Sequence, residues 1–329
     1  TDSLNRVIDS LQKVIESIPQ KKKKKKDDDE EIGADDNEPE SIRGLTPDSR
    51  LPTPDSEKDA EGDETSTAPV EPANDLVVKE LSTGRETVFA KVLEYYFSKT
   101  GDKLMFEQAK DPADSLSMRR VVLYDLKAGQ AVTLSKGGSD FRNFAMTDDG
   151  SQVAFVAERD ARPKDLVKFY KLWHYKAGMD TAEWIADKNS IGMKLGMTIS
   201  ENGNISFSKS GRRLFFCSSP VPVPKDSTII EMDMPKLDIW HYNDDYLQTV
   251  QNLPARLRAA QQENYLAMYD LETKKIRQLG SREIPQVLPT NEGDGETFVG
   301  VTDVGKRVES QWLGATRKDF YAIDVNTGY

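Results

Sequence analysis

The chain has 329 residues, of which 37% are hydrophobic and 31% are charged, and its formal net charge is −11. No apolar run approaches the ~20 residues that a membrane-spanning helix needs, which excludes a protein built of such helices. The single cysteine, Cys217, excludes a disulfide framework and a cysteine-built metal cluster, and only two histidines are available for catalysis.

Residues 1–75 differ sharply in composition from the rest. They hold 21 acidic and 11 basic side chains, whereas all 27 aromatic residues lie at or beyond Phe89. A segment with high charge and no large apolar side chains cannot offset the entropy lost on folding. The sequence therefore predicts a disordered charged and proline-rich linker over residues 21–75. The remainder is close to neutral, so no nucleic-acid-binding surface is indicated.

A short helix is expected at the start, within residues 1–20. Five apolar residues alternate at spacings of three and four, which is typical of one helix face, and Pro19 ends the pattern: Leu4, Val7, Leu11, Val14 and Ile18. Two alternatives stay open, a helix that docks or oligomerises and a helix that lies on its own protein. The lysine run at 21–26 is followed at once by acidic residues 27–31, which favours a solvated linker over a targeting signal.

Residues 76–329 carry a repeated turn pattern between short β-rich runs. The pattern reads apolar, Ser or Thr, two residues, Gly, two residues, aliphatic, one residue, Phe. The hydroxyl is expected to bond the turn backbone, and the glycine supplies a positive φ. Three copies begin at Phe97-Ser98, Met146-Thr147 and Phe207-Ser208, and a weaker fourth copy begins at Val301-Thr302 with Ser310 in place of the final Phe.

A second turn pattern, an acidic or polar residue before a tight turn, alternates with the first. It occurs at Glu80–Gly84, Asp125–Gly129, Asp270–Lys274 and Asp324–Gly328, and more loosely at Tyr175–Gly178. Alternating turns give antiparallel meanders, and self-similarity near 40–50 residues is typical of a β-propeller. We therefore expect an all-β fold over 76–329: an incomplete β-propeller of four to five blades, each a four-stranded meander of WD-like repeats. A β-sandwich is the main alternative.

Two segments depart from this repeat. Residues 244–262 read as an insertion, with a short helix around Leu253, Leu257 and Ala260. Residues 220–224 contain three prolines and read as a stiff loop, and an extra strand pair is expected around 237–242.

The candidate catalytic residues all have a simpler structural interpretation. His174 and His241 lie in the near-identical tetrapeptides LWHY and IWHY, which are expected to occupy equivalent strands of two blades. The acid pairs Asp148-Asp149 and Asp244-Asp245 are interpreted as solvated turn residues. Residues 137–141 (GGSDF) lack the second glycine of a nucleophile elbow. No catalytic, cofactor-binding or metal-ligating residue is therefore assigned in this sequence, and no cofactor is expected.

Two stretches resemble the propeller region of bacterial serine peptidases of the prolyl oligopeptidase family. They are residues 189–216, which contain ISENGNISFSKSGRRLFF, and residues 236–248, KLDIWHYNDDYLQ. In that family an N-terminal propeller gates access to a C-terminal α/β-hydrolase domain that carries Ser, Asp and His. The resemblance implies that this chain is the non-catalytic propeller fragment of such an enzyme, with peptides as substrates and the hydrolase domain as partner. It also implies an extracytoplasmic location, although no signal peptide is visible here.

The sequence departs from the family in two respects. The catalytic triad cannot be placed on any of its residues, and the Asp-Trp-x-Tyr-Glu-Glu motif of dipeptidyl peptidases is absent. A free-standing propeller that serves as a protein-interaction scaffold is therefore the alternative function, because fold alone does not define function. In the peptidase hypothesis we expect the chain to stop inside a turn at Tyr329 and to continue into further strands.

Overall fold

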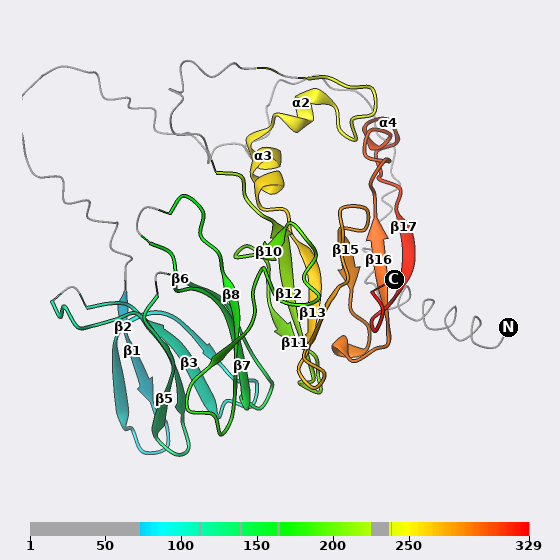
Figure 1. The fold of residues 1–329 in the computed structure, drawn as a ribbon. Coiled ribbons are helices and arrows are strands. Elements are labelled where there is room, and N and C mark those ends of the chain that lie inside the picture. The colour runs from blue at the N-terminus through cyan, green and yellow to red at the C-terminus, as the bar shows by residue number, and fades with distance from the viewer. Residues whose placement is uncertain are drawn as a thin grey trace, which may run out of the picture. The chain divides into compact units, whose positions relative to one another are not determined.

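The computed structural model describes residues 73–328, apart from 112, 139, 163–164, 225–236 and 238. These residues belong to one compact unit, Thr67–Tyr329. Its framework is four antiparallel sheets that follow one another along the chain (Figure 1). The helix expected within 1–20 and nearly all of the linker expected at 21–75 lie outside the described residues.

Each sheet is a meander of neighbouring strands, which we call blades 1 to 4 in chain order. Blade 1 contains β1 (Asn74–Lys79), β2 (Glu86–Phe97), β3 (Lys103–Gln108), β4 (Arg120–Asp125) and β5 (Gln130–Lys136). Blade 2 contains β6 (Asp140–Met146), β7 (Gln152–Glu158), β8 (Lys171–Lys176) and β9 (Glu183–Ala186). Blade 3 contains β10 (Met197–Ile199), β11 (Ser206–Phe207), β12 (Arg213–Pro220), β13 (Tyr265–Asp270) and β14 (Lys275–Gln278). Blade 4 contains β15 (Gln286–Leu288), β16 (Thr297–Thr302) and β17 (Asp319–Asp324).

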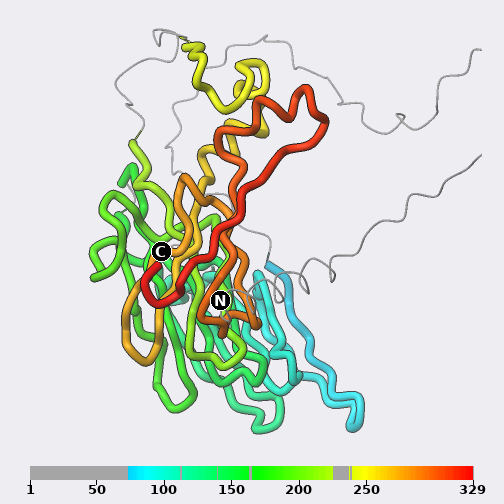
Figure 2. The backbone as a smooth tube through the Cα atoms, turned by 90° about the vertical axis from the view of Figure 1, so that its right-hand side faces the viewer, coloured from blue at the N-terminus to red at the C-terminus, as the bar shows by residue number. Residues whose placement is uncertain are grey.

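The expected propeller architecture is confirmed, with four blades in the described residues. Blade 2 is the four-stranded meander that the sequence predicts. In blade 3 the first strand is divided, because β10 and β11 pair with different parts of the same edge of β12. The blades lie in sequence order, from β1 at the left to β17 at the right (Figure 1), and Figure 2 views them from the side of blade 4. The β-sandwich alternative, with two sheets packed face to face, does not describe these four sheets.

The strand that follows the Ser/Thr–Gly turn pattern shows why the blades pack against one another. We call it the second strand of its blade and the strand before that turn the first strand, so in blade 1 these are β3 and β2. Side chains of a strand alternate between its two faces. In β7, Val153 and Phe155 pack against blade 1, whereas Ala154 and Val156 pack against blade 3. The Phe of the turn pattern points to the preceding blade in blades 2, 3 and 4, and it is fully buried in all four blades: Phe106, Phe155, Phe216 and Phe298. Each blade therefore supplies half of the core that its neighbour completes.

Blade 1 covers its other face with its own chain. Phe106 packs there with Phe89 of β2 at a ring-centroid distance of 4.6 Å, and Leu76 and Val78 of β1 join the same cluster. A register shift between Val92 and Glu94 separates the half of β2 that pairs with β1 from the half that pairs with β3. In blade 1, β1 and the first half of β2 therefore cover the face that a preceding blade covers in blades 2 to 4.

The hydroxyl-glycine turns form as the pattern predicts in blades 1 to 3. The Ser98 hydroxyl oxygen accepts the backbone N–H of Lys103 at 3.0 Å. The hydroxyl oxygens of Thr147 and Ser208 accept the N–H groups five residues further on at 3.0 and 3.2 Å. Gly101 of blade 1 adopts φ 75°, in the left-handed region that glycine enters without steric cost.

The prediction of the fourth copy of this turn at Val301-Thr302 is wrong. The copy begins at Thr290 instead of Thr302: the N–H of Gly293 donates to the Thr290 carbonyl at 3.0 Å, as in the other turns, and Phe298 holds the buried position. The copy was missed because Glu296 occupies the aliphatic position. After Thr302 the chain forms a short helix, α4 (Ser310–Leu313), before β17 begins.

The acidic turns also form as expected. The Oδ1 atom of Asp270 accepts the backbone N–H groups of Glu272 and Thr273 at 3.0 and 2.8 Å, and Asp125 and Asp324 make the equivalent pairs. These carboxylates fix the return of the chain between neighbouring outer strands.

The connections at the two ends of the strands differ in length. At one end, tight turns join the first two strands of each blade. At the other end, long connections follow the second strand, and the longest carry α2 (Gln248–Gln251) and α3 (Pro254–Gln261) in blade 3 and α4 in blade 4 (Figure 1). The helix expected around 253–260 is confirmed as α3.

The strand pair expected around 237–242 is wrong. The described residues of this segment form a loop, and Ile239, Trp240 and Tyr242 are strongly exposed. The LWHY tetrapeptide lies in β8, but the IWHY tetrapeptide lies in no blade. Its apolar residues have no neighbouring strand to complete a face, so similarity of four letters did not reflect an equivalent position.

Arg213 of blade 3 binds the turn that begins blade 4, and its replacement tests how much this contact stabilises the fold. Its buried guanidinium donates to the carbonyls of Gly293 and Gly295 at 3.2 and 2.6 Å and pairs with Glu296 at 2.8 Å. We expect Arg213→Ala to lower the free energy of unfolding by at least about 2 kcal/mol, because buried carbonyls lose their donors. Arg212→Ala is the matched control: this half-exposed arginine pairs with the exposed Glu272 and with Asp270, and Asp270 keeps two backbone N–H donors without it, so the loss should cost about 1 kcal/mol. Equal losses in urea unfolding would contradict the assignment.

Candidate functional site

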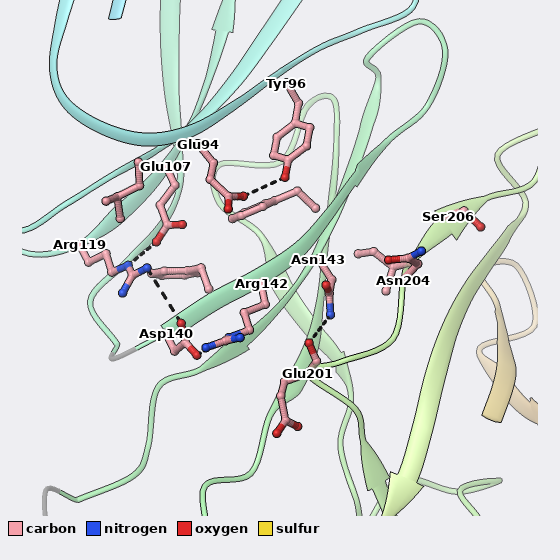
Figure 3. Close-up of a pocket in the computed structure, with 14 residues that line it drawn as sticks. Glu94, Tyr96, Glu107, Arg119, Asp140, Arg142, Asn143, Glu201, Asn204 and Ser206 are labelled. Carbon is pink, nitrogen blue, oxygen red and sulfur yellow. Dashed lines mark hydrogen bonds and ion pairs between the residues drawn. The ribbon is translucent and has the colours of Figure 1, made fainter. Parts of the chain in front are cut away.

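A pocket of about 900 Å³ lies against the first strands of blades 1, 2 and 3. This volume is in the range of small-molecule and cofactor sites. Its walls come from β2, from β6 and from the segment between β10 and β11, with side chains of β3 and the start of β4 at one side (Figure 3). The lining residues are Leu93, Glu94, Tyr96, Glu107, Arg119, Asp140, Phe141, Arg142, Asn143, Phe144, Glu201, Asn204, Ile205 and Ser206.

All three first strands are irregular where they line the pocket. In β2 the register shifts between Val92 and Glu94, and in β6 it shifts between Arg142 and Ala145. In blade 3 the strand is interrupted completely between Ile199 and Ser206. A bulge redirects side chains and ends regular pairing, and such irregularities are common beside functional sites.

Asn143 shows how the β6 irregularity is held. Its φ of 54° is uncommon for a residue other than glycine, although asparagine tolerates it better than most. The Asn143 amide Nδ2 donates to the backbone carbonyl of Glu201 at 2.8 Å. This bond fastens blade 2 to the interrupted strand of blade 3 at the pocket (Figure 3).

One wall of the pocket is a chain of alternating charges. The buried Glu107 carboxylate pairs with Arg119, whose other nitrogen lies 4.0 Å from Asp140, and Asp140 accepts Nε of Arg142 at 2.6 Å. Tyr170 donates its hydroxyl to the same Asp140 carboxylate at 2.7 Å. The bond to Asp140 raises the pKa of Arg142, and burial followed by this carboxylate raises the pKa of Tyr170. These groups satisfy one another, so the wall is rigid and electrically balanced.

Two further carboxylates line the pocket outside that chain. Glu94 accepts the Tyr96 hydroxyl at 2.8 Å, and burial together with Glu94 raises the pKa of Tyr96 to about 12. The Glu201 carboxylate makes no hydrogen bond or ion pair with the part of the chain that the structure describes, but its charge helps to raise the pKa of Arg142 and of Tyr170. The aromatic rings of Tyr96 and Phe144, with centroids 5.7 Å apart, add an apolar wall.

The pocket residues were not identified from the sequence. The segment SENGN at 200–204 has the composition of a turn, which was a usable signal, because it interrupts a strand of the repeat. The bulges in β2 and β6 leave no such mark: their residues continue an ordinary strand pattern.

The two histidines occupy unrelated positions. His174 lies in β8 with its ring 6.1 Å from that of Phe207 and Nε2 2.9 Å from Oε1 of Gln152. Burial lowers the pKa of His174 to about 4. Its neighbours Trp173 and Tyr175 point to the opposite face, as the sequence predicts. His241 lies in the exposed loop that precedes α2.

The acid pairs lie outside the pocket. The Asp148 carboxylate pairs with Lys209 of blade 3 and Lys99 of blade 1, and these bonds lower its pKa. Asp149 accepts hydrogen bonds within its own turn. Asp245 pairs with Arg307 at 3.1 Å and so joins the blade 3 insertion to that of blade 4, and Asp244 accepts the N–H of His241. Both pairs are occupied in holding turns and loops.

Cys217 lies beneath the interrupted strand. Burial raises the pKa of its thiol to about 11, so the reactive thiolate is scarce at neutral pH. Among the described residues, no group of three or more His, Cys, Asp or Glu side chains is placed to hold a metal ion. The same residues include no helix of the length and apolarity that crossing a membrane requires.

The fold and site define a propeller with a polar pocket at its first strands. No protein-family model matches the chain, and no curated protein matches it. Solved structures with a similar arrangement include Porphyromonas gingivalis dipeptidyl peptidase 4 (14% identity, 76% of this chain and 33% of that chain, TM-score 0.41). A prolyl endopeptidase is also similar, with 12% identity over 76% of this chain and 31% of that chain (TM-score 0.40). TolB from Acinetobacter baumannii has 11% identity over 78% of this chain and 48% of that chain (TM-score 0.35). This chain therefore spans from about a third to a half of their length, and identities this low assign no function.

Burial of His174 predicts a specific dependence of stability on pH. The folded state keeps the imidazole neutral down to about pH 4, whereas the unfolded chain binds a proton near pH 6.5. The contribution of the neutral imidazole to the free energy of unfolding is fully present above pH 6.5, and it falls by roughly 3 kcal/mol as the pH drops to 4. His174→Gln should flatten this part of the profile measured by urea unfolding, whereas His241→Gln should keep the wild-type slope. Identical profiles for all three proteins would refute the prediction.

Gly203 is required by close packing behind the pocket. A Cβ atom there would lie 2.1 Å from Cβ and 2.6 Å from Sγ of Cys217. We expect Gly203→Ala to destabilise the fold by about 3 kcal/mol, at the upper end of overpacking costs, since the backbone itself must move. Gly84→Ala, at an open turn with φ 72°, should cost only about 1 kcal/mol. Thermal unfolding compares the two, and a smaller effect at 203 would show that the segment shifts freely.

Proposed function

We propose that these blades are the non-catalytic propeller portion of a serine peptidase that resembles the prolyl oligopeptidase family. In this role they admit peptides to an α/β-hydrolase domain that follows in the same polypeptide, and the whole enzyme works outside the cytoplasm. The sequence blocks at 189–216 and 236–248 motivate the family. The hydrolase domain, not this chain, supplies the reaction.

The observation that carries the proposal is the contrast between the two ends of the blades. Large apolar side chains are exposed along the long connections at one end of the strands. The pocket reaches the same end, because Asp140 and Arg119 lie where β6 and β4 begin. Extended exposed apolar surface is typical of a site that another protein surface covers. The exposed residues in these connections include Leu116, Leu166, Ile239, Trp240, Tyr242, Leu257, Trp312 and Leu313.

The insertions at this end are joined into one surface. The Tyr246 ring lies between two guanidinium groups, 4.3 Å from that of Arg256 and 5.0 Å from that of Arg307. Arg307 comes from the blade 4 connection, whereas Tyr246 and Arg256 belong to the blade 3 insertion. A surface held by such contacts favours a defined partner domain over a loose tether.

The proposal predicts where the active serine lies. A fluorophosphonate probe should leave this chain unlabelled and should label the product of the gene extended past Tyr329. The extended product should also hydrolyse peptides, which the blades alone do not. An extended gene that encodes no labelled domain would overturn the peptidase proposal.

Binding of the hydrolase domain, supplied as a separate polypeptide, tests whether it docks at the end of the blades that carries the long connections. The double variant Trp240→Asp and Trp312→Asp should weaken its association with the blades about tenfold or more, because two exposed rings are replaced by charges. Trp184→Asp is the matched control, since this exposed tryptophan lies on the outer strand β9. Equal binding by the double variant would place the partner elsewhere.

A free-standing interaction scaffold is the second candidate. The surface joined through Tyr246 also favours it, because ordered exposed aromatic residues suit protein recognition. The gene sequence distinguishes the two: a scaffold has no hydrolase domain after the blades.

A further inference from the structure

We propose that the free edge of β1 is a dimerisation surface, on which β1 of a second copy of this chain pairs antiparallel about a two-fold axis at Val77. The pairing joins blade 1 of one protomer to blade 1 of its partner in one continuous sheet. This interface is independent of the proposed function, because only residues of β1 and β2 form it.

The backbone of β1 presents unpaired hydrogen-bonding groups. Among the described residues, β1 pairs with β2 alone and forms one edge of blade 1. The N–H of Glu80 donates to the carbonyl of Arg85 at 2.8 Å, which makes these two residues a hydrogen-bonded pair. Hydrogen-bonded and non-hydrogen-bonded pairs alternate along an antiparallel ladder. The N–H and C=O groups of Asp75, Val77 and Lys79 therefore point away from β2, toward the free edge.

This edge lacks two features that commonly prevent strands from pairing, proline and a bulge. β1 contains no proline, and the register shift after Asn74 places its extra residue on β2, so β1 itself stays regular. Val77 is 52% exposed, and Val88, its pair on β2, is 58% exposed. An exposed apolar pair beside a row of free backbone groups suits the addition of another strand.

The charges of β1 fit a second copy of β1. Asp75 and Lys79 lie two residues before and after Val77, on the same face of the strand. When Val77 lies opposite the partner's Val77 in an antiparallel pair, Asp75 faces the partner's Lys79, and Lys79 faces the partner's Asp75. These are also the residues whose backbone groups point outward, so the same register completes hydrogen-bonded pairs. Opposite charges that face each other across strands stabilise the pairing.

Other arrangements of two copies lose this match. A parallel pair in register would place Asp75 beside the partner's Asp75 and Lys79 beside the partner's Lys79, and like charges destabilise such pairs. Sliding the antiparallel pair by two residues would place one charge opposite the partner's Val77 and the other beyond the end of the partner's strand. The sequence of β1 therefore specifies one register, and that register has the symmetry of a two-fold dimer.

Both charged side chains can reach across the edge and keep their present contacts. Asp75 accepts the backbone N–H of Lys91 through Oδ1 at 3.1 Å, which leaves Oδ2 for the partner. Lys79 donates to Glu86 at 2.8 Å, and its ammonium group has two further donors. The pairing therefore requires no rearrangement of the β1–β2 hairpin, which keeps the ordering cost of association low.

Sedimentation equilibrium of this chain tests the dimer. We expect the apparent mass to rise with concentration from that of one chain, 36.9 kDa, toward twice that value. Val77→Pro removes an outward N–H and no bond to β2, so it should keep the fold and weaken dimerisation about tenfold or more. A wild-type mass of one chain at every concentration would overturn the proposal, and so would a dimer that Val77→Pro leaves unchanged.

Exchange of the two charges tests the register. Lys79→Glu places acidic groups opposite each other and Asp75→Lys places basic groups there, so each variant alone should dimerise about tenfold or more weakly. An equimolar mixture should restore dimers, because Asp75 of one variant faces Lys79 of the other and the two introduced side chains carry opposite charges. Mixing cannot rescue variants that have merely unfolded. Two folded variants that do not associate when mixed would refute this register.

A cysteine pair tests the position of the two-fold axis without any change of charge. The Cα atoms of a hydrogen-bonded antiparallel pair lie about 5.5 Å apart, within the reach of a disulfide. Val77→Cys should therefore form a covalent dimer in the presence of oxidised glutathione. Val88→Cys is the matched control, because this valine is similarly exposed but lies one strand further from the axis. Equal cross-linking of the two variants would contradict the arrangement.

Other occupants of the edge would give different results. If another segment of the same chain pairs with β1, the protein stays monomeric and the Val77 amide is protected from hydrogen exchange at low concentration. If the edge serves a foreign peptide strand, the protein stays monomeric and this amide exchanges rapidly. Either result would overturn the dimer.

Discussion

Each strand at the centre of a blade has two apolar faces, and no single blade can bury both. Leu214 and Phe216 on one face of β12 need blade 2, whereas Phe215 on the other face needs blade 4. The stability of every blade is therefore a property of a pair of neighbours, as in other repeat architectures. Blade 1 resolves the same constraint locally by folding β1 and the first half of β2 over Phe106. The side-by-side arrangement of sequential blades follows from this packing.

The regular parts of this arrangement were accessible from the sequence. A hydroxyl, a glycine and a phenylalanine at fixed spacing define a turn and the strand that follows it, and three of the four copies were placed correctly. The fourth was missed because Glu296 stands where the others have an aliphatic residue. That exchange has a physical reason in the fold: Glu296 is largely exposed, and it pairs with the buried Arg213 of blade 3 and accepts the amide of Asn326. A polar contact between blades there replaces an apolar one, and pattern matching cannot anticipate such a substitution.

The irregular parts were not accessible, for two different reasons. The IWHY tetrapeptide at 239–242 repeats the letters of a strand, but strand formation depends on partners, and no neighbouring strand is available to it. The pocket depends on shifts of register in β2 and β6. The residues around these shifts continue an ordinary strand pattern, which predicts an unbroken register. Asn143 adopts a positive φ at the bulge in β6, but an asparagine within an ordinary strand pattern does not reveal this conformation in the sequence. A prediction of the carboxylates that share a cavity needs the relative positions of three blades, which a single sequence does not provide.

The pocket thus lies where the strands of the repeat are least regular. A fully regular first strand in each blade would alternate its side chains between the two blade faces and leave no room for a cavity. Instead, two strands bulge and one is interrupted, and the pairing that they lose is replaced by specific contacts: Asn143 to the Glu201 carbonyl, Tyr96 to Glu94, and the Glu107–Arg119–Asp140–Arg142 series. Local departures of this kind persist only when the surrounding structure enforces them. Gly203 allows the interrupted strand to approach Cys217 on the side away from the pocket. The interruption therefore depends on contacts on both sides of the segment. The blades therefore act as a frame, and the breaks in their first strands make room for the pocket.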